Sequence, residues 1–184
     1  MDKAVVILIK SKHLEKNLFN CNKLKQKYVY KEVLLNKRLK FYMFKVFLTI
    51  FILPSLLWGN VSTYDEYFDK AGAHYNIPPL LLKNIAAIES AGNPNAIRLN
   101  DNGSKDYGLM QINSIHFRKL SQWGINERNI LNPQINIFVG SWLLSEHIKE
   151  RGFNLQAIGN YHSKTQCYKE RWLRRLVVAL KKSS

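Results

Sequence analysis

Glu89 is a carboxylic acid that the sequence places on an otherwise apolar helix face. It follows Ile85 by four residues and Leu82 by seven, and residues at these spacings lie on one side of an α-helix. The helix is expected to end at about Ser90, where the helix dipole and the exclusion of water both disfavour a negative charge. An acid that keeps its proton is what general acid catalysis requires. Glu89 is therefore a candidate general acid, and the alternative is a rim glutamate that simply reaches water.

The histidines and cysteines do not have the spacing of a metal site. After residue 60 the histidines are His74, His116, His147 and His162, and no two of them form a His-x-x-x-His or similar pair. Neither Cys21 nor Cys167 has a metal-ligand spacing. We expect no metal and no cofactor.

The elements that position Glu89 are expected to be helices. After residue 60 the apolar residues recur every three or four positions, and Gly, Pro and Asn lie between these runs. We expect a first helix that ends near 75, a second over 79–90 and short helices near 109–122. A longer helix should run from 133 toward 152, another should begin after 154, and the last should span 166–182. Pro79 suits a first helical position and Gly92 a C-terminal stop. The predicted fold is all-α, a single domain over residues 60–184.

Residues 93–107 form a polar segment, rich in turn-forming residues, that is expected to face Glu89. We find no convincing alternating strand pattern in residues 60–184 and expect an irregular loop here. A loop of this length inside a compact domain is often functional.

Three short blocks of sequence, at 87–94, 107–113 and 157–163, resemble the lytic transglycosylase family. They read Ala-Ile-Glu-Ser-Ala-Gly-Asn-Pro, Tyr-Gly-Leu-Met-Gln-Ile-Asn and Ala-Ile-Gly-Asn-Tyr-His-Ser, in the family's order over residues 65–165. The resemblance implies a mostly helical, lysozyme-like domain with a saccharide cleft. The Gly-Leu-Met-Gln-Ile-Asn and Tyr-His-Ser segments look most like the small single-domain enzymes that accompany type III secretion, type IV secretion, conjugation and pilus systems.

The resemblance also implies roles for individual residues. Glu89 matches the family's single catalytic acid and base, and Ser90 the serine that helps to orient it. The implied substrate-binding residues are Ser90, Gly108, Met110, Gln111, Asn113 and Tyr161, with Gln111 as a hydrogen-bonding group and Met110 packed against a sugar. Tyr161 matches a tyrosine close to the catalytic carboxyl. The chain has Asn160 and His162 where many members have Ala and Asn.

Two possible enzyme mechanisms, hydrolysis and substrate-assisted cleavage, differ in the number of carboxyl groups that the enzyme must supply. Glycosidases normally use two, unless the substrate supplies the second group. Asp101 and Asp106 are candidates for a second carboxylate, and the alternative for both is an Asx turn within a polar loop. The resemblance favours the substrate-assisted route, in which Glu89 cleaves the bond between N-acetylmuramic acid and N-acetylglucosamine and a 1,6-anhydro ring forms without water. A hydrolytic goose-type lysozyme and a non-catalytic peptidoglycan-binding scaffold are the other hypotheses.

Residues 43–59 have the pattern of a signal peptide. Lys45 precedes an apolar run from Val46 to Trp58, and small or polar residues follow. The run is shorter than the roughly 20 residues of a membrane-spanning helix, so we expect no stable membrane span. Because 42 residues precede this segment, we interpret residues 1–42 as an over-extended start or a disordered segment, with Met43 as the initiator. The expected location is the periplasm or cell envelope, and the alternative for residues 46–58 is a buried helix.

The chain is strongly basic, with 28 Lys and Arg against 13 Asp and Glu and a net charge of +15. Residues 1–42 contain eleven of the basic and three of the acidic groups. Because so much of the excess lies there, and no recognition motif accompanies it, we expect no nucleic-acid binding. Basic residues also gather over 166–182, where they suit an anionic envelope polymer. The expected partners are peptidoglycan glycan strands and components of a secretion or pilus apparatus.

Overall fold

A computed structural model describes residues 64–183 of the chain. The segments interpreted as an N-terminal extension, residues 1–42, and as a signal peptide, residues 43–59, lie outside the described residues.

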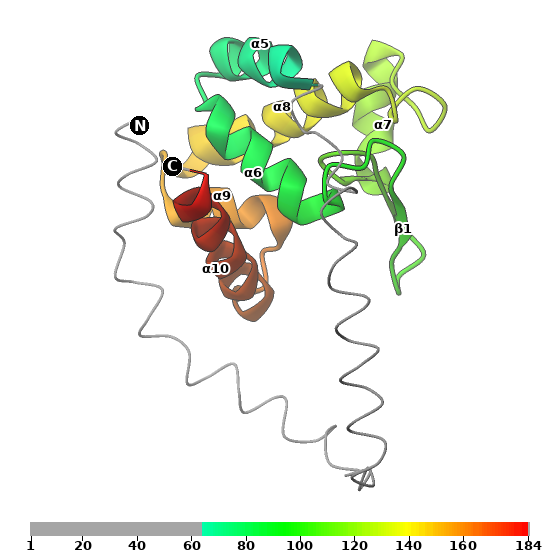
Figure 1. The fold of residues 1–184 in the computed structure, drawn as a ribbon. Coiled ribbons are helices and arrows are strands. Elements are labelled where there is room, and N and C mark those ends of the chain that lie inside the picture. The colour runs from blue at the N-terminus through cyan, green and yellow to red at the C-terminus, as the bar shows by residue number, and fades with distance from the viewer. Residues whose placement is uncertain (1–63, 184) are drawn as a thin grey trace, which may run out of the picture. The chain divides into compact units, whose positions relative to one another are not determined.

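Helices make up most of the described chain, in the arrangement that Figure 1 shows. The longer ones are α5 (Asp65–Tyr75), α6 (Pro79–Ser90), α8 (Pro133–Arg151), α9 (Leu155–His162) and α10 (Gln166–Lys182). Between α6 and α8 lie η3 (Ser114–His116), α7 (Phe117–Leu120) and η4 (Ser121–Trp123). The mostly helical fold and the bounds expected for the longer helices are confirmed.

Local sequence explains where these helices begin and end. Pro79 and Pro133 occupy first positions, where a missing backbone N–H costs nothing. The Asn154 side chain accepts a hydrogen bond from the backbone N–H of Ala157 over 2.9 Å, and so caps α9. α6 ends at Ser90, and the left-handed residue that closes it is Ala91, with a φ of 55°, one residue before Gly92.

Residues 93–107 contain two strands, so the expectation of an irregular loop was wrong. β1 (Ile97–Leu99), β2 (Lys105–Tyr107) and β3 (Ile112–Asn113) form an antiparallel sheet in the order β1-β2-β3. Ile97 pairs with Tyr107, and Tyr107 pairs with Ile112. Strands of two or three residues are too short to display an alternating pattern, which is why the sequence conceals them.

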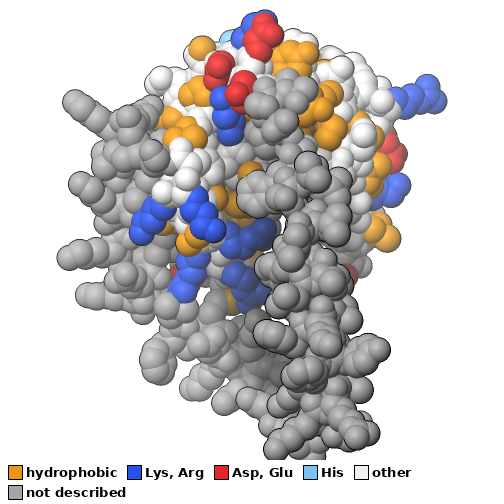
Figure 2. All heavy atoms as spheres, in the orientation of Figure 1, with side chains coloured by type: hydrophobic (Ala, Val, Ile, Leu, Met, Phe, Trp, Pro, Cys, Tyr) orange, Lys and Arg blue, Asp and Glu red, His pale blue; other side chains and the backbone are white. Residues whose placement is uncertain are grey.

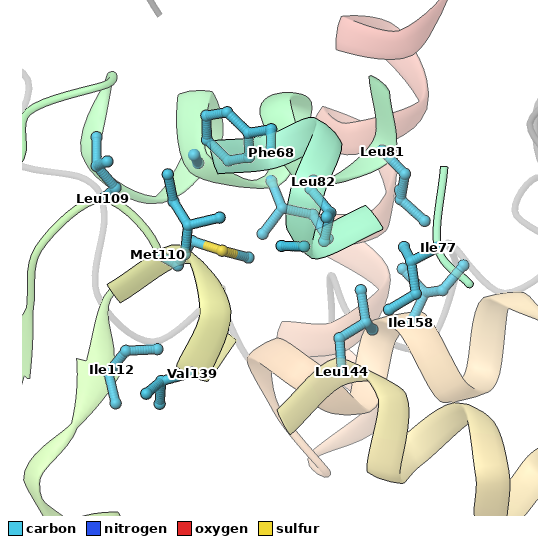
Figure 3. Packing of buried hydrophobic residues seen from close by; sticks show 14 of the residues in the cluster. Phe68, Ile77, Leu81, Leu82, Leu109, Met110, Ile112, Val139, Leu144 and Ile158 are labelled. Atoms are coloured by element: carbon cyan, nitrogen blue, oxygen red, sulfur yellow. The ribbon is translucent and has the colours of Figure 1, made fainter. Parts of the chain in front are cut away.

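The core lies among α5, α6, α8, α9 and α10. Leu81, Leu82 and Ile85 of α6 are fully buried, as the helical spacing predicts. Figure 3 shows Met110, which precedes β3, with its side chain among residues of α6 and α8. Burying this stripe fixes the rotation of α6 about its axis, and with it the direction of Glu89.

Charge is unevenly spread over the described surface. Figure 2 shows Lys and Arg side chains gathered on the side where α10 lies, and acidic side chains over α5. Among residues 64–183, no helix has both the length and the apolar character that crossing a bilayer demands.

Candidate active site

A cavity of about 870 Å³ opens beside the C-terminal end of α6. Its walls come from segments far apart in sequence, including Glu89 at the end of α6, Asp106 and Asn113 in the sheet, and Tyr161 and His162 in α9. In Figure 1 the strand β1 and the helix α10 lie on opposite sides of the C-terminal end of α6. The cavity is therefore a cleft between the sheet and the C-terminal helices.

Glu89 lies in the cleft with its side chain only 5% exposed. The indole Nε1–H of Trp172 donates a hydrogen bond to Oε1, over 2.7 Å. Nδ1 of His162 lies 3.2 Å from the same oxygen. Among the described residues, both hydrogen-bonding contacts of this carboxyl use Oε1, and neither uses Oε2.

Residues 108–111 form one wall of the cleft near Glu89 and are hydrogen-bonded to α6 and to α9. The Ser90 hydroxyl donates to the carbonyl of Leu109 over 2.9 Å, and the Tyr161 hydroxyl donates to the carbonyl of Met110 over 2.7 Å. Burial, together with the carboxylates of Glu89 and Asp106, raises the pKa of Tyr161 well above its ordinary value. Tyr161 therefore stays protonated and keeps donating to this segment.

Asn136 of α8 also hydrogen-bonds residues 107–110, and the sequence alone did not identify it as a residue of the site. It is fully buried. Its Nδ2 donates to the carbonyls of Tyr107 and Ile130 over 2.8 and 3.0 Å, and its Oδ1 accepts from the backbone N–H of Met110 over 2.7 Å. Gly108 needs its glycine here, because a Cβ would lie 2.4 Å from the Asn136 side chain and φ is +72°.

The predicted substrate-binding residues divide into two groups. Gln111, Asn113 and Tyr161 line the cleft with Glu89, whereas Ser90, Gly108 and Met110 do not appear in its lining. Met110 is fully buried, and a Cβ on Gly140 would lie 2.6 Å from its sulfur. The Met110 side chain thus packs in the core beneath the cleft and not against a sugar. The Ser90 hydroxyl donates to the carbonyls of Ala86 and Leu109, and not to the carboxyl of Glu89.

Asp106 and Asp101 occupy different environments at the sheet side of the cleft. Asp106 is 5% exposed and is bound by Arg98 at 2.7 Å, by Asn113 at 2.6 Å and by Asn100 at 3.1 Å. It joins β1, the hairpin turn and β3, so the Asx-turn interpretation was wrong for Asp106. Asp101 is exposed at the rim.

Two further histidines, His116 and His147, line the cleft. Burial lowers the pKa of His116, and the neighbouring His147 adds to this effect. Burial also lowers the pKa of His147. Within residues 64–183 no three His, Cys, Asp or Glu side chains come together as a metal site.

The comparisons with known proteins agree with this architecture. Residues 66–175 match the transglycosylase SLT domain. Protein IpgF of Shigella flexneri is 38% identical over 127 residues, which are 68% of this chain and 80% of that protein. The invasion protein IagB of Salmonella typhi is 46% identical over 116 residues, or 62% and 72% of the two chains. A peptidoglycan-binding-like protein of Escherichia coli O157:H7 is 38% identical over 125 residues, or 64% and 75%.

The matched residues 66–175 include α6, the three strands, α8 and α9 and the first part of α10. The chain belongs to the transglycosylase SLT domain family. It is a lytic transglycosylase with the mostly helical, lysozyme-like fold of that family, and peptidoglycan is the substrate class.

Proposed function

We propose that the enzyme cleaves the β-1,4 bond between N-acetylmuramic acid and N-acetylglucosamine and leaves a 1,6-anhydro ring on the muramyl product. The observation that carries this proposal is Glu89, a carboxyl 5% exposed at the cleft with Oε1 held by Trp172. Oε2 donates its proton to the glycosidic oxygen as the bond to C1 breaks. The substrate's acetamido oxygen stabilises the cationic C1, and the carboxylate then takes the proton of the 6-hydroxyl while the O6–C1 bond forms.

The surroundings of Asp106 support a single-acid mechanism. Hydrolysis with two carboxyl groups needs a second one that is free to act on the sugar or on a water. Asp106 instead accepts hydrogen bonds on both oxygens, from Arg98 on Oδ2 and from Asn113 on Oδ1. A carboxylate committed to these partners is a poor nucleophile or base.

The remaining cleft residues receive proposed roles from their positions. Gln111 and Asn113 line the cleft. The Gln111 Nε2 donates to the carbonyl of Gly108, so its Oε1 is the group proposed to accept a hydrogen bond from the sugar. The Asn113 side chain bonds Asp106 and the backbone N–H of Ile115, and its proposed role is to support the cleft. Tyr161 lines it too and holds the wall at Met110. Ser90 and Gly108 act as supports of that wall, and Met110 belongs to it.

We also propose that the enzyme works in the periplasm, where it opens peptidoglycan locally for a secretion, conjugation or pilus assembly. The signal-peptide pattern of residues 43–59 supports export. The names of two relatives, an invasion protein and a peptidoglycan-binding-like protein, are compatible with this role. Its partners would be glycan strands and components of that apparatus.

The test is a digest of purified peptidoglycan followed by mass analysis of the fragments. We expect products lighter by one water than hydrolytic products and resistant to borohydride, because the 6-hydroxyl replaces water in closing the ring. Glu89→Gln keeps the shape of the side chain, and should lower the rate by on the order of 10²-fold or more with the fold intact. Reducible, hydrated ends alone would establish a lysozyme, and normal turnover by the folded variant would remove Glu89 from the mechanism.

A further inference from the structure

Two aromatic side chains from different helices meet at one oxygen of Glu89. Trp172 of α10 is 2% exposed, and its indole N–H lies 2.7 Å from Oε1. His162, at the end of α9, places Nδ1 3.2 Å from the same oxygen. The two rings are stacked, with centroids 5.4 Å apart and 6° between their planes. Each ring therefore restricts the other as well as the carboxyl.

The hydrogen-bonding chemistry of the indole distinguishes the two carboxyl oxygens. An indole N–H only donates, so Oε1 must act as an acceptor. A neutral carboxylic acid has one O–H oxygen and one carbonyl oxygen, and the carbonyl oxygen is the better acceptor. The proton of the acid form consequently belongs on Oε2, the oxygen left to face the cleft.

We propose that Trp172 and His162 are positioning residues that place the acid proton of Glu89 on Oε2 and hold it toward the scissile bond. In this arrangement His162 carries a proton on Nδ1 and donates to Oε1 beside the indole. The inference rests on the proposed role of Glu89 as the general acid. Neither positioning residue transfers a proton to the substrate.

Kinetics of one substitution at Trp172 and two at His162 test the proposal on soluble glycan strands. Trp172→Phe keeps an aromatic ring but removes the donor, and should lower kcat about 10-fold or more while KM changes by less than about twofold. His162→Phe keeps a ring that can stack but lacks Nδ1, and should also lower kcat. His162→Asn returns an amide N–H near that position and should recover part of the loss. Trp142→Phe is the matched control, because Trp142 packs with Trp123 and Lys119 away from Glu89.

A spectroscopic measurement keeps the test valid if Trp172→Phe does not fold. In the full chain, the ¹H–¹⁵N resonance of the Trp172 indole should shift as Glu89 ionises, and this shift should vanish in Glu89→Gln. An indole resonance that ignores Glu89→Gln would overturn the proposal, as would normal kcat in Trp172→Phe and His162→Phe. If Glu89→Gln remained active, the proposed function would fail. If Glu89→Gln lost activity while Trp172→Phe and His162→Phe kept theirs, only the positioning role would be refuted.

Discussion

Replacing Asn136 with Leu tests whether one buried amide holds the cleft wall. Leu has a similar size but makes no hydrogen bonds, so it would leave two carbonyls, of Tyr107 and Ile130, and one N–H, of Met110, without their side-chain partner. A buried polar group left unpaired costs about 1–3 kcal/mol. Three such groups, partly relieved by local movement, should lower the free energy of unfolding by about 3–5 kcal/mol, a large share of a typical domain's stability.

Urea denaturation of the full chain, followed by tryptophan fluorescence, measures this change. The control is Asn126→Leu, because Asn126 also bonds local backbone groups but is exposed to water that can replace it. That variant should differ from the parent by less than about 0.5 kcal/mol. A loss below about 1 kcal/mol for Asn136→Leu would refute the reasoning, since it would mean that the residues at 107–111 hold their place without the amide.

Three further substitutions give distinct results. Tyr161→Phe removes the hydrogen bond to the carbonyl of Met110 and a phenol whose pKa is raised in the folded protein. The stability that this phenol adds is complete below about pH 10 and is lost as the pH rises further, because the unfolded chain then loses the proton first. The free energy of unfolding should therefore fall less steeply from about pH 8 to 11 in the variant than in the parent, and parallel curves would contradict this. Gly140→Ala puts a Cβ against the Met110 sulfur and should cost about 1–3 kcal/mol by thermal denaturation; an unchanged midpoint would mean that Met110 shifts freely. His147→Gln should flatten the loss of stability below about pH 6.5, because a lowered folded pKa makes protonation favour the unfolded chain; an equally steep loss in the variant would exclude His147 as its source.

The helices could be predicted because their information is local. The apolar spacing of α6 gave both its buried side and the direction of Glu89, and Pro79 and Asn154 marked helix starts within one residue. The sheet is different, because what stabilises its short strands is a set of side-chain bonds to Asp106 from β1, the turn and β3. No spacing rule reports such a tertiary cluster.

The candidate site was predictable only where one segment carries it. Trp172 is 83 residues from Glu89, and its helical spacing matches that of an ordinary core aromatic. Asn136 lies within α8 among apolar neighbours, and the only signal in the sequence was an amide on a buried face. Met110 was predicted to contact a sugar because its neighbour Gln111 lines the cleft. Its own side chain is instead buried in the core, and a sequence motif does not show which of two adjacent side chains faces the cleft.

In the proposed mechanism Glu89 is an acid in one step and a base in the next, and its contacts suit both steps. Water is largely excluded from its side chain, so the carboxyl is surrounded mainly by the protein's own groups. The indole N–H on Oε1 is already in place to stabilise the carboxylate once the proton has left, so no donor has to reorganise during the reaction. Since α10 provides that donor and the end of α6 provides the acid, the packing of these two helices sets the geometry of the reaction as directly as any residue that touches the sugar.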